Sequence, residues 1–493
     1  MLVAAAVAAF GWSLVGSFHF DDYSIFSDPA LTSRNGWAQI WGFLQTRPLT
    51  NLTFWLNYQI GGRNPVGYHA VNLALHIGCV LLLFSALRRL IPERAAWIAA
   101  ALFAVHPIVS EPVNYIFARG TLLATMFCLL ALRSWTRQRY WITVVWFAAA
   151  LLSKEECVAF PVFLLLLHIA ISRNRREWWP IAAIFTLSGA GGLRVMIATA
   201  RLAGSGAGVQ AGIARGDYLA AQGGVILRYL RLLIVPWGFT VDPQISLRIG
   251  WVAWLAWAGV IVLAAFALRW FDRARAGFWF VAGLVLLFPS SSIFPANDLA
   301  ADRRMYLPMI AFAACAGFLL RKTPNWALGI VACGLIALSV TRCEVWKSER
   351  SLWTEAVERA PDKVRPKIQL ARVSSSADAL GLLKEAENIA PDSPEVASEE
   401  GKVYLMSGNP AAALTAFGRA LALAPRDPAA FNNRGAALLG LGQREAALQD
   451  FERALALDPC QFDARLNMKR LAVEPPRASC KFTPEQKRAL RGQ

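Results

Sequence analysis

Long runs of apolar residues, separated by short polar segments, occupy the first two thirds of the chain. A helix that crosses a bilayer needs about 17–25 such residues. Runs of roughly this kind lie near residues 2–16, 70–87, 95–110, 120–132, 140–152, 158–171, 178–198, 251–268, 278–294, 305–320 and 325–341. They predict an all-α membrane domain over residues 1–342 with about eleven spans. The first run lacks a basic leader and a convincing cleavage site, so we interpret it as an uncleaved anchor.

The pattern changes near residue 346, where apolar runs end and similar residues recur at the tetratricopeptide spacing of about 34. The matching pairs are Gly401 with Gly435, Gly408 with Gly442, Phe417 with Phe451, and Ala420 with Ala454. Small residues let two helices approach closely, and phenylalanine fills the gap between hairpins. We predict an α-solenoid over 343–470, with two clear repeats, degenerate ones at 353–361 and 379–391, and a tail over 471–493.

The polar segments fall into two alternating sets. One set is basic and carries the arginine and lysine excess of cytoplasmic loops; it includes Arg88, Arg89, Arg94, Arg133, Arg137, Arg139, Arg321 and Lys322. The other set holds unusual acidic and basic motifs. An odd number of spans places the C-terminal repeats on the same, extracytoplasmic side as these motifs.

Composition agrees with a membrane protein, because 56% of the residues are hydrophobic and only 17% are charged. The net charge of +17 is explained by loop topology and contact with anionic membrane lipids, so we expect no nucleic-acid partner. Alanine- and arginine-rich usage suggests a bacterial inner membrane. Cys460 and Cys480 could pair in an oxidising compartment, with two free thiols as the alternative.

Acidic residues mark two of the extracytoplasmic segments. Asp21 and Asp22 follow the first apolar run, and Glu111 follows the pair His106-Pro107. Adjacent carboxylates at a membrane surface can bind a cation or accept a proton from a nucleophilic hydroxyl. A solvated helix cap is the alternative for the aspartate pair.

Several cations lie in the same segments, contrary to the usual charge bias of membrane proteins. They are Arg47, Arg119, Lys154, Arg228, Arg231, Arg303 and Arg304. Guanidinium groups bind phosphate oxygens in a bidentate manner, so an anionic phosphate is the expected ligand. Contact with lipid headgroups is the competing explanation.

A polar stripe at helical spacing interrupts the second apolar run. It consists of His69, Asn72 and His76. In hydrocarbon such a stripe should face the bundle interior or a cavity, where it could contact substrate or bond neighbouring helices.

Other common site signatures are missing from the sequence. It has no glycine-rich phosphate loop, no cysteine and histidine spacing for zinc, and no nucleophile elbow. A nucleotide-driven pump is therefore not expected. No cofactor is firmly implied and no metal ligands are assigned, although the paired carboxylates leave a divalent cation open.

Taken in order, several motifs resemble one known family. They are Arg47-Pro48-Leu49-Thr50 with Leu56-Asn57-Tyr58, Gly67 to His76, Phe103 to Pro107, Leu152-Ser153-Lys154-Glu155, and Arg304-Met305-Tyr306-Leu307-Pro308. The chain resembles the transmembrane and tetratricopeptide-repeat-containing O-mannosyltransferases and their bacterial relatives, which belong to the GT-C class. The resemblance implies a polyprenyl-phosphate sugar as donor and a protein serine or threonine hydroxyl as acceptor. Stacked repeats usually offer a concave surface to a protein or peptide, with a spacer or a dimerisation element as the alternative.

The resemblance also assigns residues. The acidic motif of the family maps onto Asp21 and Asp22, and its His-Pro-to-Glu segment maps onto His106, Pro107 and Glu111. The matched motifs add Glu155 and Tyr306 to the candidates for substrate binding. Where the family usually has an acidic residue, this chain reads Arg119-Gly120-Thr121, and its repeat domain is shorter than in animal members.

These observations lead to one hypothesis with two alternatives. One of Asp21 or Asp22 deprotonates or orients the acceptor hydroxyl, Glu111 supports it, and Arg303 or Arg304 with Lys154 neutralises the leaving phosphate. The alternatives are a non-catalytic membrane scaffold for envelope assembly and a ligase that transfers a whole lipid-linked oligosaccharide.

Overall fold

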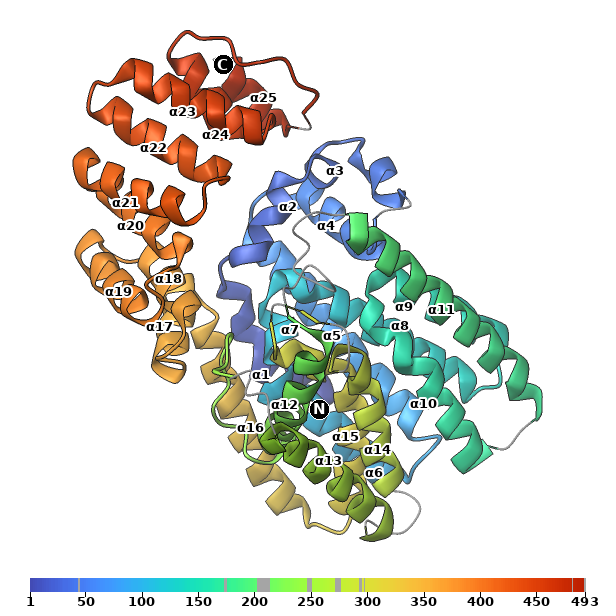
Figure 1. Ribbon diagram of the computed structural model, residues 1–493. Helices are drawn as coiled ribbons and strands as arrows, with labels where there is room; N and C mark the ends of the chain where they lie inside the picture. Colours follow the sequence, from blue (N-terminus) through green and yellow to red (C-terminus); the bar gives the residue numbers. More distant parts are fainter. Residues whose placement is uncertain are drawn as a thin grey trace. The chain divides into compact units, whose positions relative to one another are not determined.

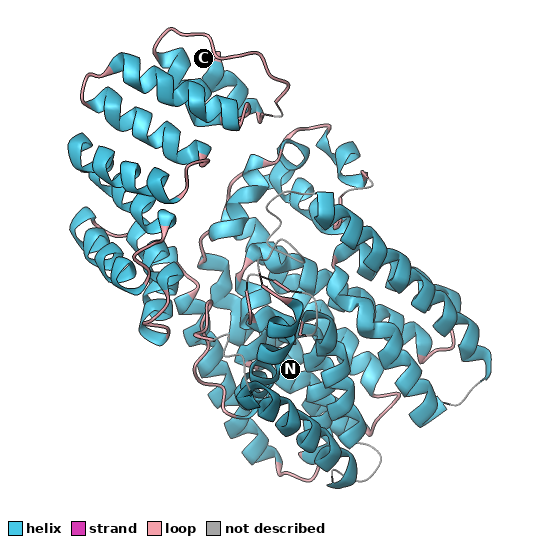
Figure 2. Ribbon diagram, viewed as in Figure 1, coloured by secondary structure: helices cyan, strands magenta, loops and turns pink. Residues whose placement is uncertain are grey.

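The computed structural model describes residues 1–42, 45–172, 175–201, 213–245, 251–270, 276–291, 295–296, 298–480 and 482–491. Within these residues the regular elements are all helices, which confirms the expected all-α fold (Figure 2). The chain forms two compact units. One contains Met1–Phe26 and Arg34–Ser348, and the other contains Ser27–Ser33 and Glu349–Gln493. We refer to them as the membrane unit and the repeat unit.

Each predicted apolar run coincides with helical structure in the membrane unit (Figure 1). Its longer helices are α1 (Leu2–Phe10), α4 (Pro48–Gly61), α5 (Pro65–Leu87), α6 (Glu93–Val105), α8 (Arg119–Trp135), α9 (Tyr140–Ser153), α10 (Phe160–Leu167), α11 (Trp178–Arg201), α12 (Arg215–Ile234), α13 (Trp251–Trp270), α14 (Ala276–Leu287), α15 (Tyr306–Leu319) and α16 (Asn325–Val345). Short helices α2 (Ser24–Ser27), α3 (Pro29–Thr32) and α7 (Ser110–Asn114) lie between them.

Five described helices are long and apolar enough to cross a membrane, and up to seven if each of two bent pairs counts as one span. The bent pairs are Leu2–Val15 with Phe20–Ser27, at 63°, and Glu93–Val105 with Pro107–Asn114, at 55°. These numbers show a multi-pass membrane protein. They fall below the expected eleven because several runs form short helices, such as the eight-residue α10.

Helix packing in the membrane unit is tight where glycine allows it. A Cβ atom on Gly317 of α15 would collide with the Ala95 carbonyl oxygen of α6. Helix α1 packs against α6 and α16, and α8 packs between α5 and α9. The shared core includes the fully buried side chains Phe103, Phe147 and Trp279.

The basic loops meet at one end of this bundle. Arg137, after α8, lies near enough to Arg88 and Arg89, after α5, for their charges to lower its pKa, although neighbouring Arg133 contributes most. Thr121 begins the opposite end of α8, about 18 Å from Arg133 along a helix that rises 1.5 Å per residue. The basic end and the end that holds the acidic and basic motifs are therefore opposite ends of the same helices.

The repeat unit is a stack of helical hairpins (Figure 1). Its helices are α17 (Glu349–Arg359), α18 (Val364–Arg372), α19 (Ser376–Ile389), α20 (Pro394–Met406), α21 (Pro410–Leu423), α22 (Pro428–Gly440), α23 (Arg444–Leu457), α24 (Phe462–Arg470) and α25 (Pro484–Leu490). Asn409 and Asp427 cap the starts of α21 and α22 with their side chains. This arrangement confirms the predicted α-solenoid.

Equivalent glycine and phenylalanine residues pack in the same way in both clear repeats. A Cβ on Gly401 would lie 2.6 Å from the Phe417 ring, and one on Gly435 would lie 2.7 Å from the Phe451 ring. The phenylalanine thus fills space inside its own hairpin, and Phe417 also packs against Ala437 of the next hairpin. The predicted role between hairpins is only part of its packing.

The segment after the last repeat is tied down. Cys460 and Cys480 form a disulfide with an S–S distance of 2.06 Å. Arg465 donates to the carbonyl oxygens of Pro459 and Pro476 at 2.7 and 2.8 Å. The structure therefore selects the paired state of the two cysteines and adds the capped helix α25 within the predicted tail.

Candidate active site

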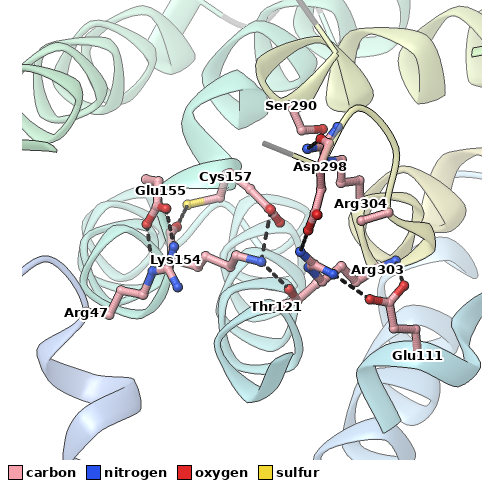
Figure 3. A network of polar contacts seen from close by, with 12 residues as sticks. Arg47, Glu111, Thr121, Lys154, Glu155, Cys157, Ser290, Asp298, Arg303 and Arg304 are labelled. Carbon is pink, nitrogen blue, oxygen red and sulfur yellow. Dashed lines mark hydrogen bonds and ion pairs between the residues drawn. The ribbon is translucent and has the colours of Figure 1, made fainter. Parts of the chain in front are cut away.

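Charged residues from four separate segments meet at the motif-bearing end of the membrane unit (Figure 3). Each comes from the end of a helix or from a short turn, where the backbone leaves the apolar bundle. They are Arg47 before α4, Glu111 in α7, Lys154 and Glu155 after α9, and Asp298, Arg303 and Arg304 before α15. We call this group the polar cluster.

One side of the polar cluster is the pair Arg47 and Glu155. The Arg47 guanidinium donates to both carboxylate oxygens, with Nε–Oε2 and Nη2–Oε1 distances of 3.0 and 2.5 Å. The carboxylate of Glu155 raises the pKa of Arg47. Burial alone would raise the pKa of Glu155, but the charge of Arg47 lowers it to about 2. Both groups are therefore ionised at neutral pH.

Lys154 is the most enclosed cation of the polar cluster, with a side chain only 8% exposed. Its Nζ donates to the Thr121 hydroxyl at 2.7 Å and lies 2.9 Å from the Glu156 carboxylate. Burial lowers the pKa of Lys154, because leaving water disfavours the ammonium, and the charge of Glu156 opposes that effect. Gly120 allows the approach, since a Cβ there would lie 3.1 Å from the Ser153 carbonyl oxygen.

Arg303 links two acids on the other side of the polar cluster. Its backbone N–H and its Nη1 donate to the two oxygens of Glu111 at 2.8 and 2.6 Å. Its Nη2 donates to Asp298 at 3.0 Å. Burial alone would lower the pKa of Arg303, but Glu111 and Asp298 raise it well above its usual value. The arginine side chain is 23% exposed, so a ligand can reach it.

Two further arginines border this region. Arg304 donates to the Tyr218 hydroxyl and to the carbonyl oxygens of Leu299 and Asp298, so it fixes the loop before α15. Arg228 of α12 pairs with Asp302 at 2.7 Å. Its Nη2 is buried without a hydrogen-bond partner, which makes it a candidate donor to an anionic ligand.

The two aspartates of the first acidic motif have different surroundings. Asp21 is exposed, and its Oδ2 accepts a hydrogen bond from the Tyr115 hydroxyl at 2.8 Å. Asp22 is fully buried, and its oxygens accept backbone N–H bonds from Phe117 at 2.7 Å and His19 at 2.9 Å. Tyr115 follows Glu111 by one helical turn, and its N–H donates to the Glu111 carbonyl oxygen. Asp21 is therefore connected to Arg303 through Tyr115 and Glu111.

The histidines singled out in the sequence lie in packed surroundings. His76 accepts from the Tyr306 hydroxyl at 2.8 Å and donates to Ala104 O at 3.3 Å. His106 Nδ1 accepts a hydrogen bond from the Ile108 N–H. Its other ring nitrogen therefore carries the proton and donates to Leu233 O. The His69 ring is fully buried and lies against the backbone of Gly16 and Ser17. None of these histidines contacts the polar cluster.

Arg119 is fully buried below the site. Its nitrogens donate to Asn72, Asn57, Thr53 and Tyr68, and the guanidinium lies 4.6 Å from the Phe54 ring centroid. Arg119 therefore joins α4, α5 and α8. Arg231 points the other way, since it is exposed and bonds to Trp237 O at 3.4 Å.

Some contacts could not be read from the sequence. The hydroxyls of Thr121 and Tyr115, the carboxylates of Glu156 and Asp302, and the amide of Asn72 all bond to predicted site residues. Thr121 stands where the related family usually has an acid, and it contacts Lys154. This departure from the family pattern is the sequence feature that could identify Thr121 as a site residue. No sequence feature identifies Tyr115 beyond its place between Glu111 and Arg119.

Across the described ranges, no group of three or more histidine, cysteine, aspartate or glutamate side chains is placed to hold an ion. The carboxylates near the polar cluster bond to arginine or lysine instead.

Comparison with known sequences points to mannosyltransferases. Residues 45–199 match the family model of dolichyl-phosphate-mannose-protein mannosyltransferases, and residues 428–459 match the tetratricopeptide repeat model. "Protein O-mannosyl-transferase F38B6.6" of Caenorhabditis elegans is 25% identical over 78% of this chain and 61% of its own length. "Protein O-mannosyl-transferase TMTC3" of Mus musculus is 33% identical over 33% of this chain and 21% of its own length. These matches confirm the resemblance, and the chain spans under two thirds of either relative.

Solved structures were compared as well. ArnT from Cupriavidus metallidurans, solved with undecaprenyl phosphate, aligns over 91% of this chain and 79% of its own at 14% identity, with a TM-score of 0.42.

Proposed function

We propose that this chain is an integral-membrane glycosyltransferase that moves a sugar from a polyprenyl-phosphate donor to a serine or threonine hydroxyl of a protein on the extracytoplasmic side. The observation that carries the proposal is the chain of contacts from Asp21 through Tyr115 and Glu111 to Arg303. It joins an exposed carboxylate to a cation suited to phosphate. The match to a mannosyltransferase model over residues 45–199 supports it.

The reaction follows from these groups. The acceptor oxygen forms a bond to C1 of the sugar while the bond between C1 and the phosphate oxygen breaks. Asp21 takes the hydroxyl proton, and the electron pair of the broken bond leaves with the polyprenyl phosphate. Arg303 is the cation closest to Asp21 along the contact chain, and Lys154 and Arg47 complete the phosphate-binding side.

The polar cluster can bind phosphate by exchanging partners. Arg47 and Arg303 have side chains 33% and 23% exposed, and each is held by carboxylates. A donor phosphate would compete with those carboxylates for the guanidinium donors. The buried ammonium of Lys154 would add positive charge on the protein side of the phosphate. Because this ammonium is partly desolvated, its attraction for the phosphate is stronger than in water.

The other expected partners follow from the two units. Membrane lipids surround the membrane unit, and the repeats offer a surface for an acceptor protein or peptide. No organic cofactor is required, since the phosphate is part of the donor. A divalent cation stays open, and transfer measured with and without a chelator decides the question.

Mass spectrometry of extracytoplasmic proteins tests the proposal. Cells with the intact chain should yield serine- or threonine-containing peptides heavier by one hexose, and cells without it should not. Complementation with Asp21→Asn or Arg303→Met should not restore the shift. Identical peptide masses in all strains would remove the transferase assignment.

The same spectra separate the two alternatives. An oligosaccharide ligase would add a mass of several sugars to each modified site. A scaffold is favoured by one observation, namely that Arg47, Lys154, Arg228 and Arg303 all lie in ion pairs within the protein. A scaffold predicts no mass change on any protein.

A further inference from the structure

We infer that Tyr115 is a positioning residue that orients the Asp21 carboxylate, and that Asn72 and Arg119 hold Tyr115 in place from below. The inference deepens the proposed function and rests on it where catalysis is concerned. It gives a role to Asn72 of the polar stripe and to Arg119, neither of which contacts the polar cluster.

The first step is the direct contact with Asp21. The carboxylate belongs to Asp21, which is exposed on the short helical turn Phe20–Tyr23, so packing against other side chains does not fix its orientation. The Tyr115 hydroxyl donates to Oδ2 at 2.8 Å. That bond leaves the other oxygen, Oδ1, to receive a proton from an acceptor hydroxyl.

The second step is the rigidity of Tyr115 itself. The side chain is 2% exposed. Its ring lies 4.8 Å from the Phe20 ring and is stacked on Trp346 with centroids 5.7 Å apart. A phenol held between two rings keeps one orientation, so the bond to Asp21 has a fixed direction.

The third step anchors the backbone around Tyr115. The Asn72 amide donates to the carbonyl oxygens of Pro112 and Tyr115, both at 3.3 Å. The amide oxygen of Asn72 accepts from Arg119 Nε at 2.8 Å, which fixes the amide orientation. A buried network whose members are all bonded holds the segment between α7 and α8 rigidly.

The charges near this contact are few. Asp22 lies beside Asp21, Arg119 acts on Asp22 from below, and Arg303 faces Tyr115 from the loop before α15. A Tyr115→Phe substitution changes none of these charges. It removes only the hydroxyl, so any change in the reactivity of the Asp21 carboxyl group reports the lost hydrogen bond.

Carbodiimide labelling of Asp21 tests the inference without requiring transfer. A carbodiimide followed by an amine converts a carboxyl group into an amide, and the rate of this labelling at one fixed pH is measured by peptide mass. The Tyr115 hydroxyl occupies one oxygen of Asp21, so the labelling rate should rise about threefold to tenfold in Tyr115→Phe. Asp21→Asn should abolish the label, and Tyr23→Phe, whose hydroxyl bonds to the Phe18 carbonyl, should leave the labelling rate unchanged.

Kinetics supply the second readout. Transfer by Tyr115→Phe should have a kcat about ten- to hundredfold lower with little change in KM, because orientation and not binding is lost. If Tyr115→Phe does not fold, incorporation of difluorotyrosine at position 115 keeps the hydroxyl, strengthens the bond, and should lower the labelling rate of Asp21.

The outcomes separate the inference from the proposed function. A raised labelling rate without glycosylated protein supports the positioning role and removes the transferase assignment. An unchanged labelling rate in Tyr115→Phe overturns the inference even if Asp21 proves essential. If Asn72 acts through Tyr115, Asn72→Asp alone should lower kcat. The same substitution should lower kcat little further when it is combined with Tyr115→Phe.

Discussion

Asp21 and Asp22 are neighbours in sequence, but only Asp21 has a carboxylate oxygen available to a substrate. Both oxygens of Asp22 accept backbone N–H bonds, and an asparagine would provide only one acceptor. We therefore predict that Asp21→Asn lowers transfer by about 10²-fold or more and leaves the melting temperature unchanged. Asp22→Asn should lower the melting temperature by a few degrees. Transfer rates and thermal unfolding of both variants check this, and full activity in Asp21→Asn would exclude it as the base.

Lys154 should set the alkaline limit of activity. Because burial lowers its pKa, the ammonium should lose its proton below the value of about 10.4 usual for lysine. Lys154→Arg stays charged, so its transfer activity, although reduced, should persist to higher pH than that of the wild type. Lys154→Met should lose about 10²-fold at neutral pH, and this difference from the wild type should shrink at alkaline pH, where Lys154 is itself uncharged. Rates measured across pH 7–11 distinguish these profiles, and equal alkaline limbs for lysine and arginine would contradict the assignment.

The ion pair of Arg47 and Glu155 should contribute stability that depends on pH. Glu155 has a folded pKa of about 2 and an unfolded value near 4.3. The stabilisation is therefore fully present above about pH 4.3 and is lost as pH falls towards 2. Glu155→Gln should melt about 2–4 °C lower at pH 7 and show a smaller loss in that acid range. Thermal unfolding against pH provides the check, and parallel curves for both proteins would argue against it.

The sequence predicts which residues lie at the site better than it predicts their hydrogen-bond partners. Arg47, Lys154 and Arg303 were recognised because cations on that side of a membrane are unusual, and the structure brings them into one cluster. The roles of Arg119 and His76 could not be predicted, since a polar residue in an apolar run can bind substrate or bond a neighbouring helix. Only the partners, Asn72 for Arg119 and Tyr306 for His76, show the second use.

Helices were the most predictable elements, because each apolar run has its own hydrophobic signal. Their lengths were less predictable: α10 and α14 are shorter than a span requires. The packing of one helix on another could not be predicted from single runs. Gly317 shows why, since its need for glycine comes from Ala95, more than two hundred residues away in the chain.

The close packing at Gly317 can be tested by adding a methyl group there. Gly317→Ala should destabilise the membrane unit by about 1–3 kcal/mol, because the new methyl group would meet backbone that cannot move easily. Gly329→Ala in α16 is a matched control, since nothing lies within 4 Å of the added Cβ. The control should be neutral or slightly stabilising. Melting temperatures of both variants in one detergent test the difference, and equal values would contradict the packing.

At the scale of the whole molecule, the two units carry different parts of the proposed function. The membrane unit contains every residue of the polar cluster, and the repeat unit is a separate compact body closed by the disulfide Cys460–Cys480. A disulfide is stable in oxidising compartments, which supports an extracytoplasmic repeat unit. The division into a membrane unit and repeats follows from the end of the apolar runs and the start of the repeat pattern near residue 346, whereas the pairing of the two cysteines could only be left open from sequence.

Complementation of a deletion strain distinguishes an enzyme from a scaffold at this scale. We predict that the full chain restores the phenotype, whereas the full chain with Asp21→Asn does not, although it is present in the membrane at equal amounts. The Gly329→Ala chain serves as the positive control. Rescue by the Asp21→Asn chain would favour the scaffold, because the protein would then act without its proposed base.

Reconstituted transfer is the most direct test of the central claim. The purified full chain in lipid nanodiscs would be given a polyprenyl-phosphate hexose and an extract of extracytoplasmic proteins, and intact peptide masses would be recorded. The account predicts a single-hexose increase on serine or threonine with the wild type and none with Asp21→Asn or Arg303→Met. An equal increase with the Asp21→Asn protein, or none with the wild type over a range of lipid-linked hexoses, would contradict it.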